Sequence, residues 1–425
     1  MRFSIGAAAI SGYNIVLKLA VRPDRVGPDL PGGTSAADGP RSKGEEILFR
    51  KLRYLPLVVC GVWIAAGLLC SRARAAEPVH VFILAGQSNM QGHGRAEVGN
   101  GGVTGAIGSL RYLVNTAPAH YGHLVKPNGT WATRSDVWIN YNTGSIESPI
   151  TVRGDLTVGY GNVGDIAATG SNLKIGPELG FGNIMGDLFT GQVLLIKEAW
   201  GGKSLAVDFR PPSSGGTVGP YYTKILTDVQ DVLNNLGTHF PDYQGQGYVL
   251  EGIAWHQGWN DRVNQTYNDE YETNLVNFIK DIRKDLNAPD LPFVVASTGM
   301  SGWGETHPRA LSLMQHQQDA VDPTRHPEFA GNTGFVETRD FWRDAGVSPV
   351  DQAYHWNQNA ETLYLIGKGL GDEMAVLVPE PTSCLLLIAG AAAILRCRRA
   401  RIPTAPADAR RSMPPSFAGS ASGSG

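Results

Sequence analysis

Ser88 is the residue whose type and position point most directly to chemistry. It follows residues 79–85, a strongly apolar run that predicts a buried strand, and it stands within Gly86-Gln-Ser-Asn-Met90. A turn at this point exposes the hydroxyl at the carboxyl end of a sheet, where open α/β folds bind their ligands. Most serines in such places are helix caps, so the position alone is a weak signal for a nucleophile.

The longer string around Ser88 is more specific. Phe82-Ile-Leu-Ala-Gly-Gln-Ser-Asn-Met-Gln-Gly92 resembles the nucleophile block of the SGNH hydrolases, and within them the sialate O-acetylesterase-like group, carbohydrate esterase family 6. The resemblance covers nearly all of residues 77–376. It implies a three-layer, flavodoxin-like α/β/α fold and a serine-dependent hydrolase of acetyl esters on carbohydrates. It also implies that Ser88 is the nucleophile.

A glycine pair matches the next block of the family. Glu198-Ala-Trp-Gly-Gly-Lys203 follows a second predicted strand, where the family places a glycine whose N–H faces the substrate oxyanion. Glycine suits that task because its backbone can approach a ligand closely. Gly201 and Gly202 both fit, and we favour Gly201; the alternative is a tight strand-to-loop turn.

A third block supplies a side-chain donor. Trp255-His-Gln-Gly-Trp-Asn-Asp261 resembles the family block that carries Gln257 over to the oxyanion hole, beside the N–H groups of Ser88 and Gly201. An amide can donate to a tetrahedral oxyanion without adding charge. Trp259 stands where the family usually has glutamate, so any role of that glutamate is absent here.

His355 is the base that the resemblance assigns. It lies just before the last predicted helix, where the family keeps its catalytic histidine, and a neutral imidazole can take and return the serine proton. The family pattern places an aspartate three residues earlier, but position 352 is glutamine. We therefore assign Asp351 as the acid partner through a one-residue bulge. A backbone carbonyl, Asp340 and Asp344 are the alternatives.

No cofactor is expected. The resemblance implies an acetyl-enzyme mechanism that needs no metal, and His120 and His123 do not form a recognised ligand spacing with the scattered carboxylates.

Alternating strand and helix patterns predict the scaffold. Strands are expected at 79–85, 192–198, 252–256, 292–297 and 334–338, and helices at 178–189, 221–236, 267–286, 306–320 and 357–374. This alternation is typical of about five parallel strands covered by helices on both faces. Residues 98–172 are rich in Gly, Asn, Thr and aromatics with little helical period, so we expect an irregular or β-rich insertion over the active face.

The charge is divided unevenly along the chain. Residues 77–378 hold 19 Lys and Arg against 32 Asp and Glu, a net charge of −13, whereas the remaining residues carry +10 and bring the total to −3. An acidic body argues against nucleic acid as a partner, because binding phosphates requires a basic surface. All four cysteines also lie outside this body, which excludes a disulfide or thiolate metal site within it.

The N-terminal region resembles a targeting segment. Residues 50–76 combine a basic start, an uncharged apolar run and a small-residue cleavage signal near Ala75 or Ala76, which predicts a signal peptide and export. The apolar run is 16 residues long (55–70), short of the ~20 that a membrane span needs. Residues 1–49 are interpreted as a non-native or disordered extension, with translation starting near residues 48–52.

The C-terminal region resembles a second targeting segment. Val378-Pro-Glu-Pro381, a short apolar run and an arginine cluster at 396–399 resemble the PEP-CTERM sorting signal, which covers 378–401 here. The resemblance implies an exosortase-type partner in a bacterium and a periplasmic, cell-surface or extracellular location, with membrane contact through the terminal segments only. A plain C-terminal membrane tail is the alternative. Residues 402–425 are of low complexity and are expected to be disordered.

Two other functions compete with the esterase. One is a surface-displayed glycan-binding or matrix protein that keeps the SGNH fold without catalysis. The other is an SGNH lipase or thioesterase, against which the Gln257 block argues. A pure binding module has no need to keep Ser88, Gln257 and His355 together, so the esterase is preferred.

Overall fold

The computed structural model describes residues 77–97, 107–162 and 173–378. Four predicted segments lie outside the described residues: the extension at 1–49, the signal peptide at 50–76, the sorting signal beyond Val378, and the tail at 402–425. No helix in the described ranges is long and apolar enough to cross a membrane.

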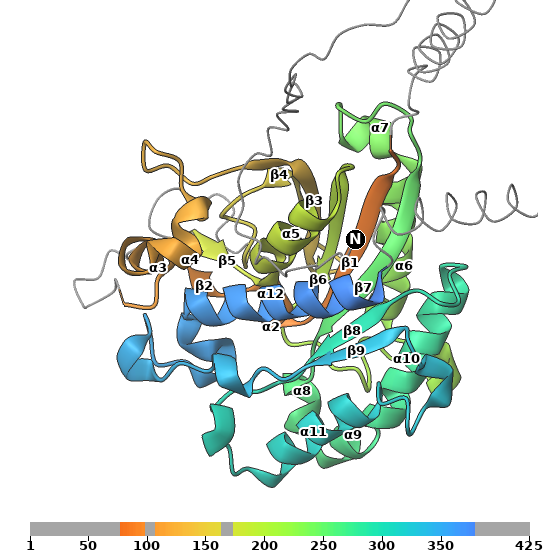
Figure 1. The fold of residues 1–425 in the computed structure, drawn as a ribbon. Coiled ribbons are helices and arrows are strands. Elements are labelled where there is room, and N and C mark those ends of the chain that lie inside the picture. Colours follow the sequence, from red (N-terminus) through yellow and green to blue (C-terminus); the bar gives the residue numbers. More distant parts are fainter. Residues whose placement is uncertain (1–76, 98–106, 163–172, 379–425) are drawn as a thin grey trace, which may run out of the picture. The chain divides into compact units, whose positions relative to one another are not determined.

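A seven-stranded sheet forms the centre of this region (Figure 1). Its strand order is β4-β3-β6-β1-β7-β8-β9, and every neighbouring pair is parallel except β3 and β4. The strands are β1 (Val79–Gly86), β3 (Arg134–Gly144), β4 (Pro149–Leu156), β6 (Val193–Ala199), β7 (Tyr248–His256), β8 (Phe293–Ala296) and β9 (Thr333–Val336). A separate antiparallel pair joins β2 (Gly94–Arg95) to β5 (Lys174–Ile175).

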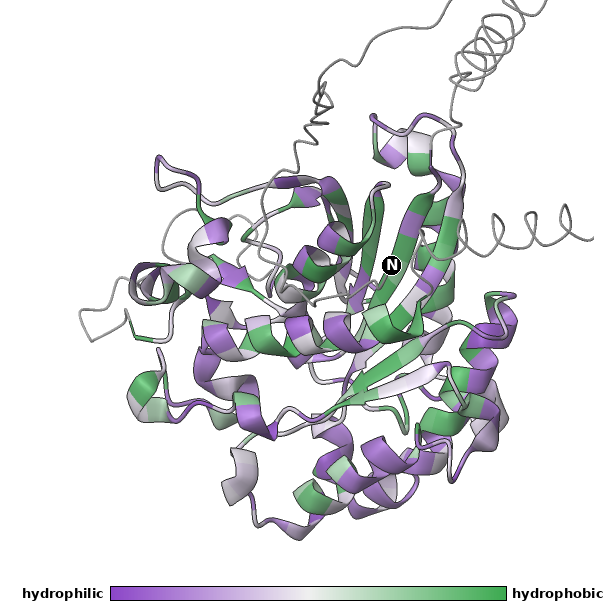
Figure 2. Ribbon diagram, in the orientation of Figure 1, coloured by the Kyte–Doolittle hydropathy of each residue, from purple (hydrophilic) through white to green (hydrophobic). Residues whose placement is uncertain are grey.

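Helices cover both faces of the sheet. On one face, α5 (Pro177–Leu188) and α12 (Ala360–Leu377) pack on Phe82 and Leu84 of β1. On the other face, α6 (Pro220–Asn234) and α10 (Tyr271–Asp285) pack on residues 81 and 83 of the same strand. Alternate side chains of β1 therefore pack into two apolar layers, one on each face of the sheet. Figure 2 shows the strands in green, as hydrophobic, and the covering helices with both green and purple residues. The predicted three-layer α/β/α fold is confirmed.

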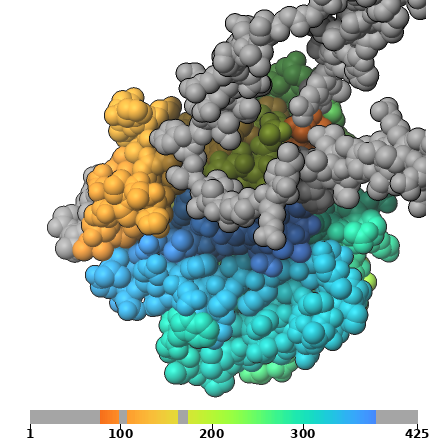
Figure 3. Space-filling view, in the orientation of Figure 1, coloured from red at the N-terminus to blue at the C-terminus, as the bar shows by residue number. Residues whose placement is uncertain are grey.

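None of the remaining α-helices in the described residues is longer than α5, and they lie around these layers. They are α2 (Ser88–Gln91), α3 (Leu110–Thr116), α4 (Pro118–Tyr121), α7 (Leu236–His239), α8 (Trp259–Arg262), α9 (Gln265–Asp269) and α11 (Pro308–Asp319). Two contacts join the α3–α4 region to α12, Tyr121 Oη with Glu361 at 3.2 Å and His123 Nε2 with Tyr364 Oη at 3.2 Å. This region forms the orange lobe beside the blue C-terminal segment in Figure 3.

The described part of the insertion follows the β-rich alternative. Within residues 98–172, β3 and β4 add a parallel and an antiparallel strand to the sheet, so 134–156 extends the sheet and is not an irregular covering. Hydrogen bonding to β6 decides this, because the polar residues of β3 have partners there that no local pattern reveals. Asn142, for example, donates to buried Glu198 at 2.6 Å. The five predicted strands are all present, and β3 makes the sixth parallel one among the described residues.

Glycines let α5 and α12 pack backbone to backbone. A Cβ at Gly367 would lie 1.9 Å from the carbonyl oxygen of Pro177, and one at Gly180 would lie 2.2 Å from that of Tyr364. Any side chain at either position would push the two helices apart. This close contact matters for function because α12 begins directly after the segment that carries His355.

Candidate active site

One pocket of about 350 Å³ collects the main sequence-predicted residues at the carboxyl ends of β1, β6 and β7. Parallel strands end together at this edge, which is where open α/β sheets bind ligands. Three predicted site residues from distant parts of the chain line it, namely Ser88, Gly201 and His355. The other lining residues are Gln87, Gln91, His93, Asn162, Gly202, Trp259, Asn260 and Tyr354.

Ser88 begins the short helix α2 directly after the central strand. The strand ends at Gly86, where a Cβ would lie 2.2 Å from the carbonyl oxygen of His256 on β7. Only glycine allows this approach, and it turns the chain so that Ser88 faces the pocket. Its hydroxyl has no hydrogen-bond partner among the described residues, so it is available to a ligand.

Gly201 is the glycine that approaches the nucleophile. A Cβ on it would lie 3.8 Å from the Cβ of Ser88, whereas the nearest atom to a Cβ on Gly202 is Asn260 Nδ2 at 3.9 Å. Gly202 takes a left-handed conformation with φ of +72°, and its carbonyl accepts from Asn260 Nδ2. Gly201 is therefore the nearer of the two to Ser88, and its role as the backbone donor stays a prediction.

His355 is held at the pocket by a strained turn. The next three residues, Trp356, Asn357 and Gln358, have φ between +52° and +53°. This left-handed backbone conformation is rare for residues other than glycine. Burial of Trp356 and two hydrogen bonds of Asn357 hold the turn, to Gln352 N at 2.9 Å and to Arg343 O at 3.0 Å. Such strain is often stored where function requires one side-chain orientation.

Gln352, and not Asp351, contacts the base. His355 Nδ1 lies 3.3 Å from Gln352 Oε1, whereas Asp351 is exposed and forms no ion pair with His355. The proposed bulge is absent, so an amide occupies the position three residues before the histidine where the family has a carboxylate. The expected alternatives are engaged elsewhere. Asp340 accepts from Trp303, and Asp344 accepts from Trp342.

A chain of amides determines the tautomer of His355. Arg95 Nε donates to Gln358 Oε1 at 2.8 Å, and Gln358 Nε2 donates to Gln352 Oε1 at 2.6 Å. Because arginine can only donate, each amide in the series has one allowed orientation. Gln352 therefore presents an oxygen to the imidazole, Nδ1 carries the proton, and Nε2 is left as the basic nitrogen.

Electrostatics keep that imidazole neutral. Burial, with a smaller contribution from Lys174, lowers the pKa of His355 to about 4. An amide partner has no negative charge that would raise the pKa again. The base is therefore unprotonated at neutral pH, which is the form that can accept the serine proton.

Gln257 does not line the pocket. Its side chain is buried, and its Nε2 donates to Asp261 at 2.6 Å, to the carbonyl of Lys203 at 3.0 Å and to Gln87 Oε1 at 3.3 Å. The structure thus differs from the predicted oxyanion role. The side chain turns inward because Asp261 is a stronger acceptor than anything in an open pocket.

A known protein family matches the region that holds this pocket. Residues 78–362 match the family described as "Carbohydrate esterase, sialic acid-specific acetylesterase". The chain belongs to this family. It is therefore a carboxylic ester hydrolase that acts on acetyl groups of carbohydrates. No curated protein compared with the esterase gives a significant match.

Three solved structures are similar to the esterase at low identity. A protein from Arabidopsis thaliana is 16% identical with a TM-score of 0.44, covering 70% of this chain and 98% of its own. A carbohydrate acetylesterase from Xanthomonas citri is 12% identical with a TM-score of 0.40, covering 69% and 56%. A carbohydrate esterase family 2 enzyme with a carbohydrate-binding domain, from Corynascus (Myceliophthora fergusii), is 14% identical with a TM-score of 0.33, covering 72% and 68%.

A buried carboxylate anchors the loop that follows Gly201 and Gly202. Asp261 accepts from the backbone N–H groups of Leu205 and Ala206, both at 2.9 Å, and from Gln257. Burial raises the pKa of Asp261 to about 7, although all three donors favour its ionised form. Asp261, the last residue of the Gln257 block, thus holds residues 201–206, the predicted oxyanion loop.

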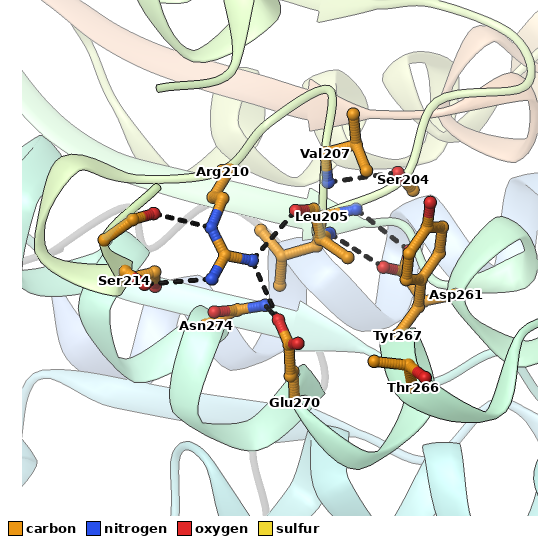
Figure 4. A network of polar contacts seen from close by, with 12 residues as sticks. Ser204, Leu205, Val207, Arg210, Ser214, Asp261, Thr266, Tyr267, Glu270 and Asn274 are labelled. Carbon is orange, nitrogen blue, oxygen red and sulfur yellow. Dashed lines mark hydrogen bonds and ion pairs between the residues drawn. The ribbon is translucent and has the colours of Figure 1, made fainter. Parts of the chain in front are cut away.

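Arg210 ties the far end of the same loop to the helices (Figure 4). Its guanidinium donates to the carbonyls of Ala206 and Ser214, both at 2.9 Å, and pairs with Glu270 at 2.8 Å. Several donors fixed in one plane give a rigid anchor. Together with Asp261 this arginine keeps the segment after β6 in one conformation.

Sequence reasoning missed four residues of the esterase site. His93 lies flat on His355, Gln87 and Asn162 line the pocket with their amides, and Gln352 replaces the expected acid. Gln87 stands within the nucleophile block and His93 directly follows it, so their nearness to Ser88 in sequence was an available signal. Gln352 stands three residues before His355, where the family has its aspartate, and this spacing was the signal for its contact with the imidazole.

Metal chemistry has no obvious site in this part of the chain. The described residues of the esterase contain no group of three or more His, Cys, Asp or Glu that could hold a metal ion.

Proposed function

We propose that this protein is an exported serine esterase that removes O-acetyl groups from carbohydrates through an acetyl-enzyme intermediate. The observation that carries the proposal is that Ser88, Gly201 and His355 line one pocket although they lie far apart in the sequence. A nucleophile, a backbone donor and a base are the groups that acyl transfer requires.

The reaction has two halves. Ser88 Oγ attacks the acetyl carbonyl while His355 Nε2 takes the hydroxyl proton, and the oxyanion is held by the N–H groups of Ser88 and Gly201. The C–O bond to the sugar then breaks, and the imidazolium returns the proton to the leaving alcohol. Water attacks the acetyl-enzyme by the same route, which releases acetate and restores Ser88.

Two aromatic side chains at the mouth support a carbohydrate as the alcohol. Trp259 and Tyr354 both line the pocket with ring centroids 6.1 Å apart, and Tyr354 is 45% exposed. Arg262 covers one side of Trp259 at 3.9 Å. Flat apolar faces beside a nucleophile suit the apolar faces of a sugar ring.

A nucleophile substitution tests the proposal. The full-length protein should release p-nitrophenol from p-nitrophenyl acetate and acetate from acetylated xylan, and Ser88→Ala should abolish both activities. Ser148→Ala, on the exposed connection between β3 and β4, is the matched control and should retain them. Equal rates for the Ser88→Ala and unaltered proteins would instead favour the glycan-binding function.

Export and sorting are the finer part of the proposal. The signal peptide at 50–76 and the PEP-CTERM-like segment at 378–401 support secretion and recognition by an exosortase-type partner. The mature protein should begin near residue 76 or 77 and be found outside the cytoplasm. N-terminal sequencing of protein from the producing cells tests this, and a peptide from residues 1–45 in the mature protein would contradict it.

A further inference from the structure

We propose that Gln87 supplies the side-chain donor of the oxyanion hole, in the role that the sequence assigned to Gln257. The inference rests on the proposed esterase function and names a further catalytic residue for it. Three structural observations carry it: the orientation of the Gln87 amide, its place beside the nucleophile, and the engagement of every other amide in the pocket.

The orientation of the amide is dictated by its partners. Gln87 Oε1 accepts from the backbone N–H of Gly258 at 3.0 Å, from that of Asn260 at 3.4 Å, and from Gln257 Nε2 at 3.3 Å. A backbone N–H can only donate, so the oxygen must face these groups. The NH₂ group therefore takes the other position, where it has no hydrogen-bond partner among the residues that the structure describes.

That NH₂ group belongs to a side chain on the pocket wall. Gln87 precedes Ser88 directly, lines the same pocket and is only 2% exposed. An amide donor on the pocket wall without a protein acceptor is free to donate to an arriving acceptor, and no protein hydrogen bond has to break first. The tetrahedral oxyanion formed at Ser88 is such an acceptor, and it gains more from the donor than the neutral carbonyl does.

The other amides of the pocket already donate to protein atoms. Gln91 Nε2 donates to Thr143 Oγ1 at 2.7 Å, Asn162 Nδ2 lies 3.1 Å from His93 Nε2, and Asn260 Nδ2 donates to the carbonyl of Gly202. Recruiting any of them would break a bond that holds the site together. Gln87 can serve without such a loss.

Gln257 then acts through Gln87 as a positioning residue. Its amide links Asp261, the carbonyl of Lys203 and Gln87 Oε1, so it connects the oxyanion loop to the proposed donor. The same block of sequence keeps its importance, but the group that touches the substrate belongs to the nucleophile block.

Gln87→Glu is the most selective variant. It keeps an oxygen for Gly258 and Asn260 but replaces the donor with a second oxygen. We expect kcat on p-nitrophenyl acetate, measured on the pH plateau, to fall by about 10²–10³, with KM changed less than about threefold. Gln87→Met removes the same donor without adding a charge. A fall of similar size in this variant would exclude repulsion by the new carboxylate as the cause.

The outcomes separate this inference from the function on which it rests. If Ser88→Ala is inactive while Gln87→Glu or Gln87→Met keeps kcat within about threefold, only the inference fails. If Ser88→Ala is fully active, the proposed function itself fails.

A structure of the full-length protein with methylboronic acid keeps the test independent of how the variants fold. The boronate bonds to Ser88 Oγ, and its oxygen occupies the oxyanion position. We expect that oxygen within hydrogen-bond distance of Ser88 N, Gly201 N and Gln87 Nε2. An oxygen bound to Gln257 Nε2, or with no contact to Gln87, would overturn the assignment.

Discussion

The imidazole of His93 lies flat against that of His355, with ring centroids 3.7 Å apart and an angle of 9° between their planes. Burial, followed by the nearness of His355, lowers the pKa of His93 to about 2, so this ring stays neutral at working pH. Asn162 Nδ2 lies 3.1 Å from His93 Nε2 and fixes the orientation of the ring. A buried, neutral, immobile ring thus forms the wall against which the base rests.

Removing that wall should weaken catalysis and change its pH dependence. In His93→Ala, water reaches His355, so its pKa should rise toward the ordinary 6.5 and kcat/KM should fall by about tenfold as the ring becomes mobile. His93→Phe keeps a flat apolar neighbour and should lose much less. Profiles of kcat/KM against pH for both variants check this, and identical profiles for Ala and Phe would contradict it.

The unaltered enzyme should remain active in mildly acidic solution. Only neutral His355 can act as the base, and its pKa is lowered to about 4. Activity should therefore be lost only as the pH falls through about 4, instead of near 6.5. The measurement is kcat/KM on p-nitrophenyl acetate between pH 3.5 and 8, with circular dichroism at each pH to detect unfolding. An acidic limb centred near 6.5 would refute the prediction.

Restoring a carboxylate beside the base should shift the same limb upward. Gln352→Glu keeps the oxygen that faces His355 Nδ1 but adds a negative charge, which favours the imidazolium and should raise the pKa of His355 by about 1–3 units. Because the imidazolium also forms in the transition state, kcat on the plateau should rise.

Asp351→Asn is the matched control for that change. Asp351 is exposed and does not pair with His355, so its profile should follow that of the unaltered enzyme within about threefold. A large loss of kcat in Asp351→Asn would contradict this and would indicate that Asp351 is the acid partner of His355.

A buried ion pair behind the pocket should dominate stability. Lys197 and Glu178 are both fully buried with Nζ and Oε2 2.7 Å apart, and Lys197 Nζ also donates to the carbonyls of Gln91 and Tyr160, both at 2.7 Å. Burial lowers the pKa of the lysine and raises that of the glutamate, and their mutual attraction opposes both shifts.

Lys197→Met should therefore reduce the free energy of unfolding by about 3–5 kcal/mol, because it leaves Glu178 buried without its partner. The double variant Lys197→Met/Glu178→Gln removes that charge and should recover part of the loss. Urea unfolding of the full-length proteins gives both values. A double variant less stable than Lys197→Met would contradict this explanation.

Local patterns were sufficient for most of the scaffold. The apolar run at 79–85 predicted β1, and the helical period at 357–374 predicted α12, which spans Ala360–Leu377. Both elements bury nearly continuous apolar surfaces, so their hydrophobic residues alone indicate that they lie in the core. The sequence allowed β-structure in the insertion but did not place β3 in the sheet. Asn140 and Asn142 are buried through hydrogen bonds to other segments, and a polar residue gives no sign of such a partner in advance.

The sequence by itself indicated the family and the three-layer fold, because short blocks around the site keep their spacing. The same blocks predicted Ser88 as the nucleophile, Gly201 as the backbone donor and His355 as the base, and these roles stay predictions that the experiments above test. Only the tertiary structure decided which side chains face the pocket. It turned Gln257 toward Asp261, left the amide NH₂ of Gln87 without a partner beside Ser88, and set Gln352 instead of Asp351 against His355. The physical reason is that an amide or carboxylate takes the direction of its best available hydrogen-bond partners, and those partners come from segments far away in the chain.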